Sequence, residues 1–255
     1  MKRFLFPGLL ACAMVGSVAM AATPGADNEF RQAMAALQSN DFTTGLHHLE
    51  LAIADDPDNL RYTSEYRQAI IRHKEFDRSI EFLAKLLADH PQSANLHLNY
   101  GFAYVDKIPI AGSITQVILA NTALGEFSKA VDLQATWLAY YTRGASYLFW
   151  PKLFGKAPLG VADLEKALAM QQNGLKKSYY VRTYVALGDG YCKMEEMDKA
   201  RATWQEGLRQ FPDSPQLRSR LSLRGDELTK LIENSFDPNK RVDTDLREIW
   251  SDGQQ

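Results

Sequence analysis

The stretch 178–214 constrains the fold of this chain more than any other part of the sequence. It holds small and large apolar residues at fixed spacing and ends in a proline: Tyr184, Leu187, Gly188, Tyr191, Ala200, Trp204, Gly207 and Pro212. Small residues let two antiparallel helices approach closely, and large ones fill the space between them. Proline ends the second helix because it lacks an amide hydrogen and clashes with a continuing turn. One helix pair cannot bury its apolar face alone, so the pattern predicts neighbouring pairs.

This spacing resembles the tetratricopeptide repeat, a 34-residue helix–turn–helix unit with the pattern W-x2-L-G-x2-Y, A-x3-F and P. Tyr184 stands in place of the tryptophan, and Trp204 stands in place of the phenylalanine. The resemblance covers about residues 25–234 and is most specific in the last repeat. It implies an all-α protein, a right-handed α-solenoid of about five such helix-turn-helix repeats with a C-terminal capping helix.

Laying this register on the chain predicts repeats at 25–59, 60–93, 94–136, 137–174 and 178–214. Pro57 and Pro91 lie 34 residues apart, which supports the period. Residues 215–235 carry a leucine stripe and are expected to form one capping helix, in which Gly225 permits a kink. Residues 236–255 form a polar tail that either folds back on the solenoid or acts as a short docking motif.

Repeats three and four depart from the pattern, because apolar insertions enlarge the turn between their two helices. In a solenoid such turns lie along one edge, so the two insertions are expected to be neighbours. One interpretation is that they pack on each other or extend the helices. The other is a lip that binds a partner protein, a lipid or an apolar small molecule. The insertion residues expected to contact a partner are Ile108, Ile110, Ile114, Phe149, Trp150 and Phe154.

The lysines that flank these insertions leave a peripheral membrane or lipid contact open. Lys107 precedes the first insertion, and Lys152 and Lys156 lie within the second. Each could meet an anionic headgroup. Lysines flank many turns, so this feature by itself does not favour lipid over protein.

Residues 1–21 resemble a secretory signal peptide. Lys2 and Arg3 precede an apolar run, and residues 19–21 form a small-x-small cleavage site. The alternatives are an uncleaved membrane anchor, for which the run is short, and a lipoprotein acylated on Cys12. Cleavage predicts a periplasmic or secreted protein, in which Cys192 would be the remaining cysteine and no intrachain disulfide could form.

Charge argues against nucleic acid as the partner. The formal net charge of −2 becomes −4 when Lys2 and Arg3 are removed, and the sequence has no basic stripe. The mature chain is therefore mildly acidic. The sequence leaves the oligomeric state open.

The sequence predicts no enzyme, metal site or cofactor. His47 and His48 are adjacent on a predicted helix and point in different directions, whereas a zinc site needs three or four converging ligands. Cys192 is expected to be a packing residue, because no neighbouring histidine is implied by spacing. No convergent set of acid, base and nucleophile is visible.

The first helices of successive repeats line a concave groove in this family, which commonly holds a peptide or a partner helix. By register, the residues expected to face the groove and bind a partner are Asn99, Phe102, Tyr141, Leu148, Arg182, Val185 and Asp189. Aromatic rings beside Asn and Arg suit an extended peptide. A register slip of one residue would instead place half of these side chains in the core between repeats. The Lys/Asn/Arg set of chaperone-binding carboxylate clamps is not reproduced.

The resemblance therefore implies a non-enzymatic scaffold or adaptor of the bacterial cell envelope, which binds another envelope protein or peptide through the groove and the two insertions. The alternative function is a periplasmic carrier or sensor of a hydrophobic small molecule or lipid that acts with a transporter.

Overall fold

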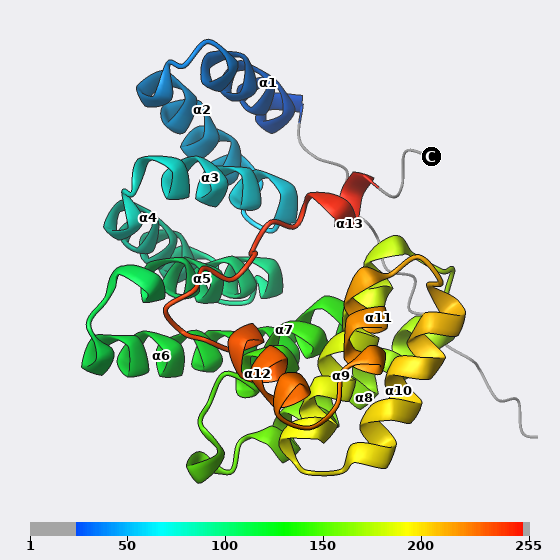
Figure 1. The fold of residues 1–255 in the computed structure, drawn as a ribbon. Helices are drawn as coiled ribbons and strands as arrows, with labels where there is room; N and C mark the ends of the chain where they lie inside the picture. The colour runs from blue at the N-terminus through cyan, green and yellow to red at the C-terminus, as the bar shows by residue number, and fades with distance from the viewer. Residues whose placement is uncertain (1–23, 252–255) are drawn as a thin grey trace, which may run out of the picture.

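The computed structural model describes residues 24–251, and in this range the chain folds into thirteen α-helices and no β-strand. Successive helices pair and stack into a curved solenoid (Figure 1). This confirms the predicted all-α fold. The predicted signal peptide, with Cys12, lies outside the described residues.

The helix bounds follow the predicted repeats closely. Repeats one and two comprise α1 (Pro24–Gln38), α2 (Phe42–Asp55), α3 (Leu60–His73) and α4 (Phe76–Asp89). Repeats three and four comprise α5 (Ala94–Lys107), η1 (Ile108–Ile110), α6 (Ser113–Leu133), α7 (Trp137–Tyr147), η2 (Lys152–Phe154) and α8 (Ala157–Gln172). Then come η3 (Ser178–Tyr180), α9 (Val181–Lys193), α10 (Met197–Gln210), α11 (Pro215–Ser222), α12 (Gly225–Ser235) and α13 (Arg247–Ser251). None of these helices has the length and apolar character needed to cross a membrane.

The three regular repeats share one turn between their two helices. Asn40, Lys74 and Glu195 occupy the left-handed region, with φ of 62°, 61° and 65°. In each case the next backbone N–H donates to the carbonyl five residues earlier, at 2.9 to 3.3 Å. This bond satisfies a carbonyl that the end of the helix would otherwise leave unpaired. The turn reverses the chain within a few residues, so the second helix packs antiparallel on the first.

Close approach at glycine brings the two helices together in repeats three and five. A Cβ built on Gly188 would lie 2.1 Å from Nε1 of Trp204, whose side chain is fully buried. In repeat three, a Cβ on Gly101 would lie 2.4 Å from Cε1 of Phe127, which is also fully buried. In both repeats a large ring therefore lies directly against the backbone of the first helix.

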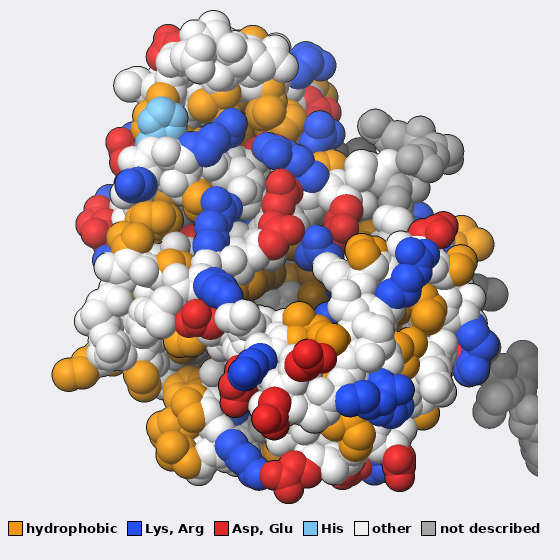
Figure 2. Space-filling view, in the orientation of Figure 1, with side chains coloured by type: hydrophobic (Ala, Val, Ile, Leu, Met, Phe, Trp, Pro, Cys, Tyr) orange, Lys and Arg blue, Asp and Glu red, His pale blue; other side chains and the backbone are white. Residues whose placement is uncertain are grey.

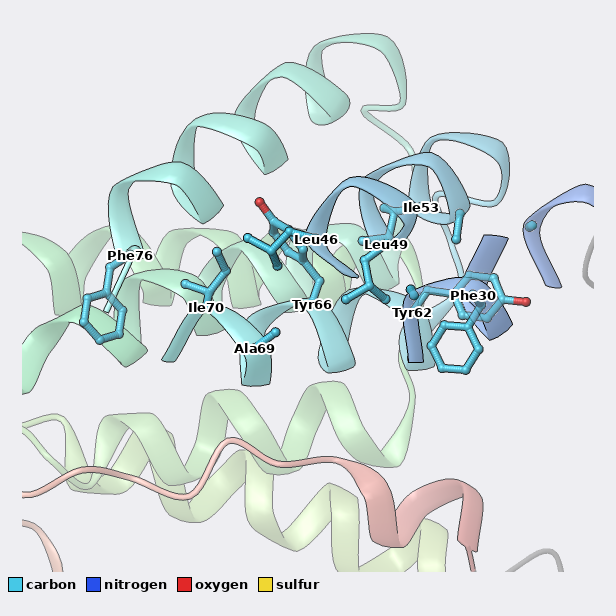
Figure 3. Packing of buried hydrophobic residues seen from close by; sticks show 12 residues of the cluster. Phe30, Leu46, Leu49, Ile53, Tyr62, Tyr66, Ala69, Ile70 and Phe76 are labelled. Atoms are coloured by element: carbon cyan, nitrogen blue, oxygen red, sulfur yellow. The ribbon is translucent and has the colours of Figure 1, made fainter. Parts of the chain in front are cut away.

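Apolar cores follow one another along the solenoid. Figure 3 shows the first, in which Leu46 and Leu49 of α2 lie beside Tyr66 and Ile70 of α3. Phe30 of α1 stacks on Tyr62 at 4.7 Å between ring centroids. Each core joins one pair to the next, as expected when a single pair cannot bury its own face.

The two insertions take different forms. Most of the first extends α6, which begins at Ser113, ten residues before the regular pattern resumes at Ala123. The second remains an irregular connection, with the short helix η2 and Gly155 at φ +60°. The interpretation that insertions extend helices therefore holds for repeat three only.

The cap consists of two helices, which differs from the single helix expected at 215–235. Leu223 and Arg224 are extended, and Gly225 has φ +51°. Arg201 donates to the carbonyl oxygens of Leu221 and Leu223 at 3.4 and 3.1 Å. The break lets Leu217 of α11 and Leu228 of α12 pack into the same core, which one straight helix could not do.

We expect Gly188→Ala to lower the free energy of unfolding by about 1–3 kcal/mol, because the new methyl group overlaps the Trp204 ring. Gly125→Ala is the matched control. Gly125 is an exposed helical position with nothing within 4 Å of its Cβ position. This change should stabilise the protein by about 0.5–1 kcal/mol through helix propensity. Urea denaturation measures both, and equal effects of the same sign would contradict the packing account.

Candidate binding groove

The tail folds back along the concave face of the solenoid, here called the groove, which α3, α5, α7 and α9 form. In Figure 1 the tail leaves α12, crosses α5 and ends in α13. Helix α13 contacts α3 near the other end of the solenoid. Of the two arrangements weighed for the tail, the structure has the folded-back one.

A buried polar network fixes the middle of the tail. Arg67 is fully buried, and its Nε donates to Asn99 Oδ1 at 2.9 Å. Its Nη1 donates to Asp106 Oδ2 at 2.8 Å, and its Nη2 donates to the backbone oxygen of Thr244 at 3.0 Å. The Thr244 hydroxyl donates to the other oxygen of Asp106 at 2.5 Å. The guanidinium also lies over the Phe102 ring, 4.8 Å from its centroid. The groove thus recognises one peptide carbonyl and one hydroxyl through paired charges.

An apolar site lies two residues further along the tail. Leu246 is only 5% exposed and joins the core cluster that contains Leu98, Phe102 and Ala139. Ile249 and Trp250 pack on the same cluster. The aliphatic site therefore continues the interior of repeats three and four into the groove.

Ion pairs hold both sides of this segment. Arg247 donates to both oxygens of Glu65 on α3, at 2.7 and 2.5 Å. Arg182 on α9 lies 2.7 Å from Glu248 Oε1 and 3.5 Å from Asp243 Oδ2. Arg241 also donates to Gln68 Oε1 at 3.3 Å. The charges of the groove and of the tail are complementary.

A cavity of about 760 Å³ lies between the tail and the two insertions. Its wall is largely apolar and aromatic: Phe102, Val105, Ile108, Val117, Ala120, Leu124, Trp137, Leu138, Tyr141, Phe149, Trp150, Phe236, Val242, Leu246 and Ile249 all line it. Both insertions contribute to this wall, as their expected proximity requires. The size falls in the range of small-molecule sites.

The outer edge of the insertions exposes a second apolar surface. Figure 2 shows hydrophobic side chains along the lower left of the molecule, over the start of α6 and the α7–α8 connection. Ile114 is 82% and Leu153 is 83% exposed, and the others in this set are Ile110, Val117, Ile118 and Phe154. We call these six residues the apolar edge. Contiguous exposure of this kind marks an interaction surface more often than a solvated one.

The structure brings together four of the predicted groove residues. Asn99 belongs to the Arg67 network, Phe102 packs on Leu246, and Arg182 pairs with the tail. Tyr141 lines the cavity and stacks on Trp137 with ring centroids 5.0 Å apart. All four therefore lie where a groove ligand would bind.

The other three groove residues pack within the solenoid. Leu148 is fully buried among α7, α8 and α9. Asp189 is buried in a bidentate pair with Arg220, at 2.5 and 2.6 Å. Val185 packs in the core of the last repeat, and its backbone oxygen accepts from Trp204 Nε1 at 3.4 Å. In this conformation the Leu148 and Asp189 side chains are out of reach of a partner, because the register places them between repeats.

The predicted insertion residues fall into two groups, those that line the cavity and those on the apolar edge. Ile108, Phe149 and Trp150 are half-buried and line the cavity. Ile110, Ile114 and Phe154 are exposed on the apolar edge. A ligand of the cavity and a partner on the edge would therefore use different members of the set.

Sequence reasoning missed the residues that hold the tail: Glu65, Arg67, Asp106, Thr244, Leu246 and Arg247. One signal was present, because Asn99 and Asp106 are seven residues apart and share a face of one helix. Arg67 reads as a surface residue in the sequence. Its hydrogen bond to the backbone oxygen of Thr244 joins positions 177 residues apart in sequence, so no local pattern could predict it.

Burial shifts the pKa of three titratable groups that line the cavity. Burial raises the pKa of the Cys192 thiol and that of the Tyr141 hydroxyl, so both keep their protons near neutral pH. Burial lowers the pKa of the Lys193 ammonium, which lies over the Phe236 ring, 4.7 Å from its centroid. Among residues 24–251 no group of three His, Cys, Asp or Glu side chains converges as a metal site would require.

Comparison with solved structures identifies the fold. A thermophilic TPR protein of Thermus thermophilus superposes with a TM-score of 0.55 at 20% identity, over 77% of this chain and 97% of that one. A tetratricopeptide repeat protein of Parabacteroides merdae gives 0.56 at 12% identity, over 90% and 80%. This chain has the tetratricopeptide repeat (TPR) fold. The MamA protein gives 0.51 at 16% identity, over 79% and 97%.

These likenesses concern the TPR fold alone, because a fold carries many functions and these identities are low. No family model and no curated protein matches the sequence. What this TPR protein binds must therefore be argued from its own groove.

We expect Arg67→Met to lower the free energy of unfolding by about 3–5 kcal/mol, because it leaves Asp106 buried without its cation. Arg182→Met is the control, since its partners Asp243 and Glu248 are partly exposed. Loss of exposed ion pairs should cost about 1 kcal/mol or less. Urea denaturation compares the variants, and a similar loss for both would contradict the buried network.

Proposed function

We propose that this protein is a non-enzymatic scaffold or adaptor of the bacterial cell envelope, which binds an extended segment of a partner protein in the groove. The observation that carries the proposal is the tail, which lies in the groove as a bound peptide would. Buried side chains meet its backbone carbonyl, its hydroxyl and its leucine. TPR folds in general suit such protein partners.

The chemistry of the groove supports a peptide over a nucleic acid. Arg182 and Glu65 present opposite charges, and both meet side chains of the tail. A polyanion would need a stripe of cations to neutralise successive phosphates. Paired charges of both signs instead give orientation and register to a mixed-charge polypeptide.

The apolar edge adds a second contact for the same partner. Its residues Ile110, Ile114 and Phe154 are exposed on the outer side of the two insertions. Apolar area of this kind becomes favourable when a partner covers it. The envelope location rests on the signal-peptide pattern at 1–21, and the absence of enzymatic function rests on the lack of a convergent acid, base and nucleophile in the groove.

A photo-crosslinking amino acid at Val105 should capture one partner polypeptide in cells that make the protein natively. Val105 lines the cavity beside the groove. The same group at Lys85, an exposed position on α4, is the matched control and should not give that product. Mass spectrometry identifies the partner and the crosslinked segment. If both positions give the same products, or if Val105 gives none, the scaffold function is wrong.

The cavity favours a second candidate function, a carrier or sensor of a hydrophobic small molecule or lipid that acts with a transporter. Its 760 Å³ volume and its aromatic wall suit an apolar ligand. Lys193 lies at this wall over Phe236 and could meet a polar or anionic end of such a molecule.

Native mass spectrometry of the purified protein tests this second function. A carrier should retain a ligand whose mass adds to that of the polypeptide. Ala120→Trp fills the cavity and should remove this added mass, whereas Ala84→Trp, at an exposed position on α4, should keep it. An unliganded wild-type protein that also fails to bind lipids added in vitro would contradict the carrier function.

A further inference from the structure

The tail carries the chemistry of the ligand that the groove is built to bind. We infer that the tail occupies the partner's place, and that the partner segment repeats its pattern. That pattern is an acidic residue, a hydroxyl residue, any residue, an aliphatic residue, an arginine and an acidic residue, as in residues 243–248. The inference deepens the proposed scaffold function and rests on it.

Alternate burial over residues 243–246 matches an extended peptide, and α13 begins directly after it at Arg247. Thr244 and Leu246 are buried, whereas Asp243 is exposed and Asp245 is partly exposed. Side chains two apart in an extended chain point to the same side. The groove therefore contacts two inward side chains, Thr244 and Leu246. Asp245 between them contacts the tail itself: it accepts from the Arg247 backbone N–H at 2.9 Å and lies 3.3 Å from the Arg247 guanidinium.

The first inward position requires a hydroxyl group. Thr244 donates to Asp106 while its backbone oxygen accepts from Arg67, and both groove residues are buried. A valine there would leave an oxygen of Asp106 without its donor in a dry site, which is costly. Serine or threonine satisfies this position in a partner.

The second inward position requires an aliphatic side chain, and the flanking positions require charge. Leu246 fills the site formed by Leu98, Phe102 and Ala139. The next residue must present a guanidinium to Glu65, since two parallel bonds form there. Acidic residues at both ends meet Arg182.

A partner can replace the tail because every contact of residues 243–248 with the groove can be remade by another chain. Helix α13 has five residues and is too short to persist alone. The tail competes mainly through its covalent link, which gives it an effective concentration of about millimolar order. A substitution that weakens the contacts of the chain's own tail with the groove should therefore let a separate peptide of the same sequence bind there.

The experiment uses the mature chain and a fluorescein-labelled peptide of residues 239–251, with binding measured by anisotropy. The chain with Leu246→Ala should bind this peptide at least about 10-fold more tightly than the wild-type chain. Lys240→Ala is the matched control, because the Lys240 ammonium donates to Asn234 on α12 and not to the groove. It should bind as weakly as wild type.

Peptide variants test each position of the pattern against the Leu246→Ala chain. Thr244→Val in the peptide should weaken binding about 10- to 100-fold, through loss of a hydrogen bond to a charged acceptor. Arg247→Glu in the peptide should weaken it at least as much, because it faces Glu65. Asp245→Ala in the peptide should weaken binding less than Thr244→Val does, because Asp245 contacts Arg247 of the same segment and not the groove.

A folded Leu246→Ala chain that gains no peptide binding would overturn the inference and make the tail a permanent part of the fold. If that chain does not fold, Arg247→Gln in the chain replaces it, since this side chain is about half exposed. It should bind the peptide a few-fold more tightly than wild type. If its affinity for the peptide does not rise, the inference is overturned in the same way. If the peptide does not bind but a partner is still crosslinked at Val105, the inferred partner pattern is wrong and the scaffold function stands. If neither the peptide binds nor a partner is crosslinked, the scaffold function is wrong as well.

Discussion

The packing of repeats three and five depends on direct contact between a large ring and the backbone of the facing helix. Trp204 rests on Gly188, and Phe127 rests on Gly101. The contact brings two helices together, but it leaves the outer face of each pair apolar. Stacking the next pair buries that face, and the solenoid is the result. Curvature then produces a concave side, a large surface that the helices of several repeats share.

The insertions in repeats three and four modify this plan at one edge. The regular turn, with Lys74 or Glu195 in the left-handed region, reverses the chain in a few residues. Where the turn is enlarged, α6 starts ten residues early and the connection before α8 spreads outward. The inserted residues form part of the wall of the cavity on the inner side, and they leave Ile114 and Leu153 exposed on the outer side. The enlarged turns of repeats three and four thus create two surfaces, the cavity wall and the apolar edge.

The tail occupies the groove. Arg67 and Asp106 form a buried pair, and each of them hydrogen-bonds Thr244 of the tail. A buried ion pair adds little stability by itself and more often specifies an arrangement. Here the arrangement is the register of one peptide, set by the hydroxyl of Thr244 and the side chain of Leu246. The groove is therefore more selective than its apolar wall suggests.

The sequence by itself determined the all-α repeat fold, the division into repeats and the position of both insertions, because these follow from local spacing. Gly188 and Trp204 lie in adjacent helices, so their pairing is readable from the chain. It also placed Asn99, Phe102, Tyr141 and Arg182 on the groove side. Only the tertiary structure decided that Leu148 and Asp189 face a neighbouring repeat, since a helix turns by about 100° per residue and a small error in register moves a side chain from groove to core. Only the tertiary structure brought Glu65 to Arg247. These residues are far apart in sequence and meet because the solenoid curves and the tail folds back across it, which no local pattern can predict.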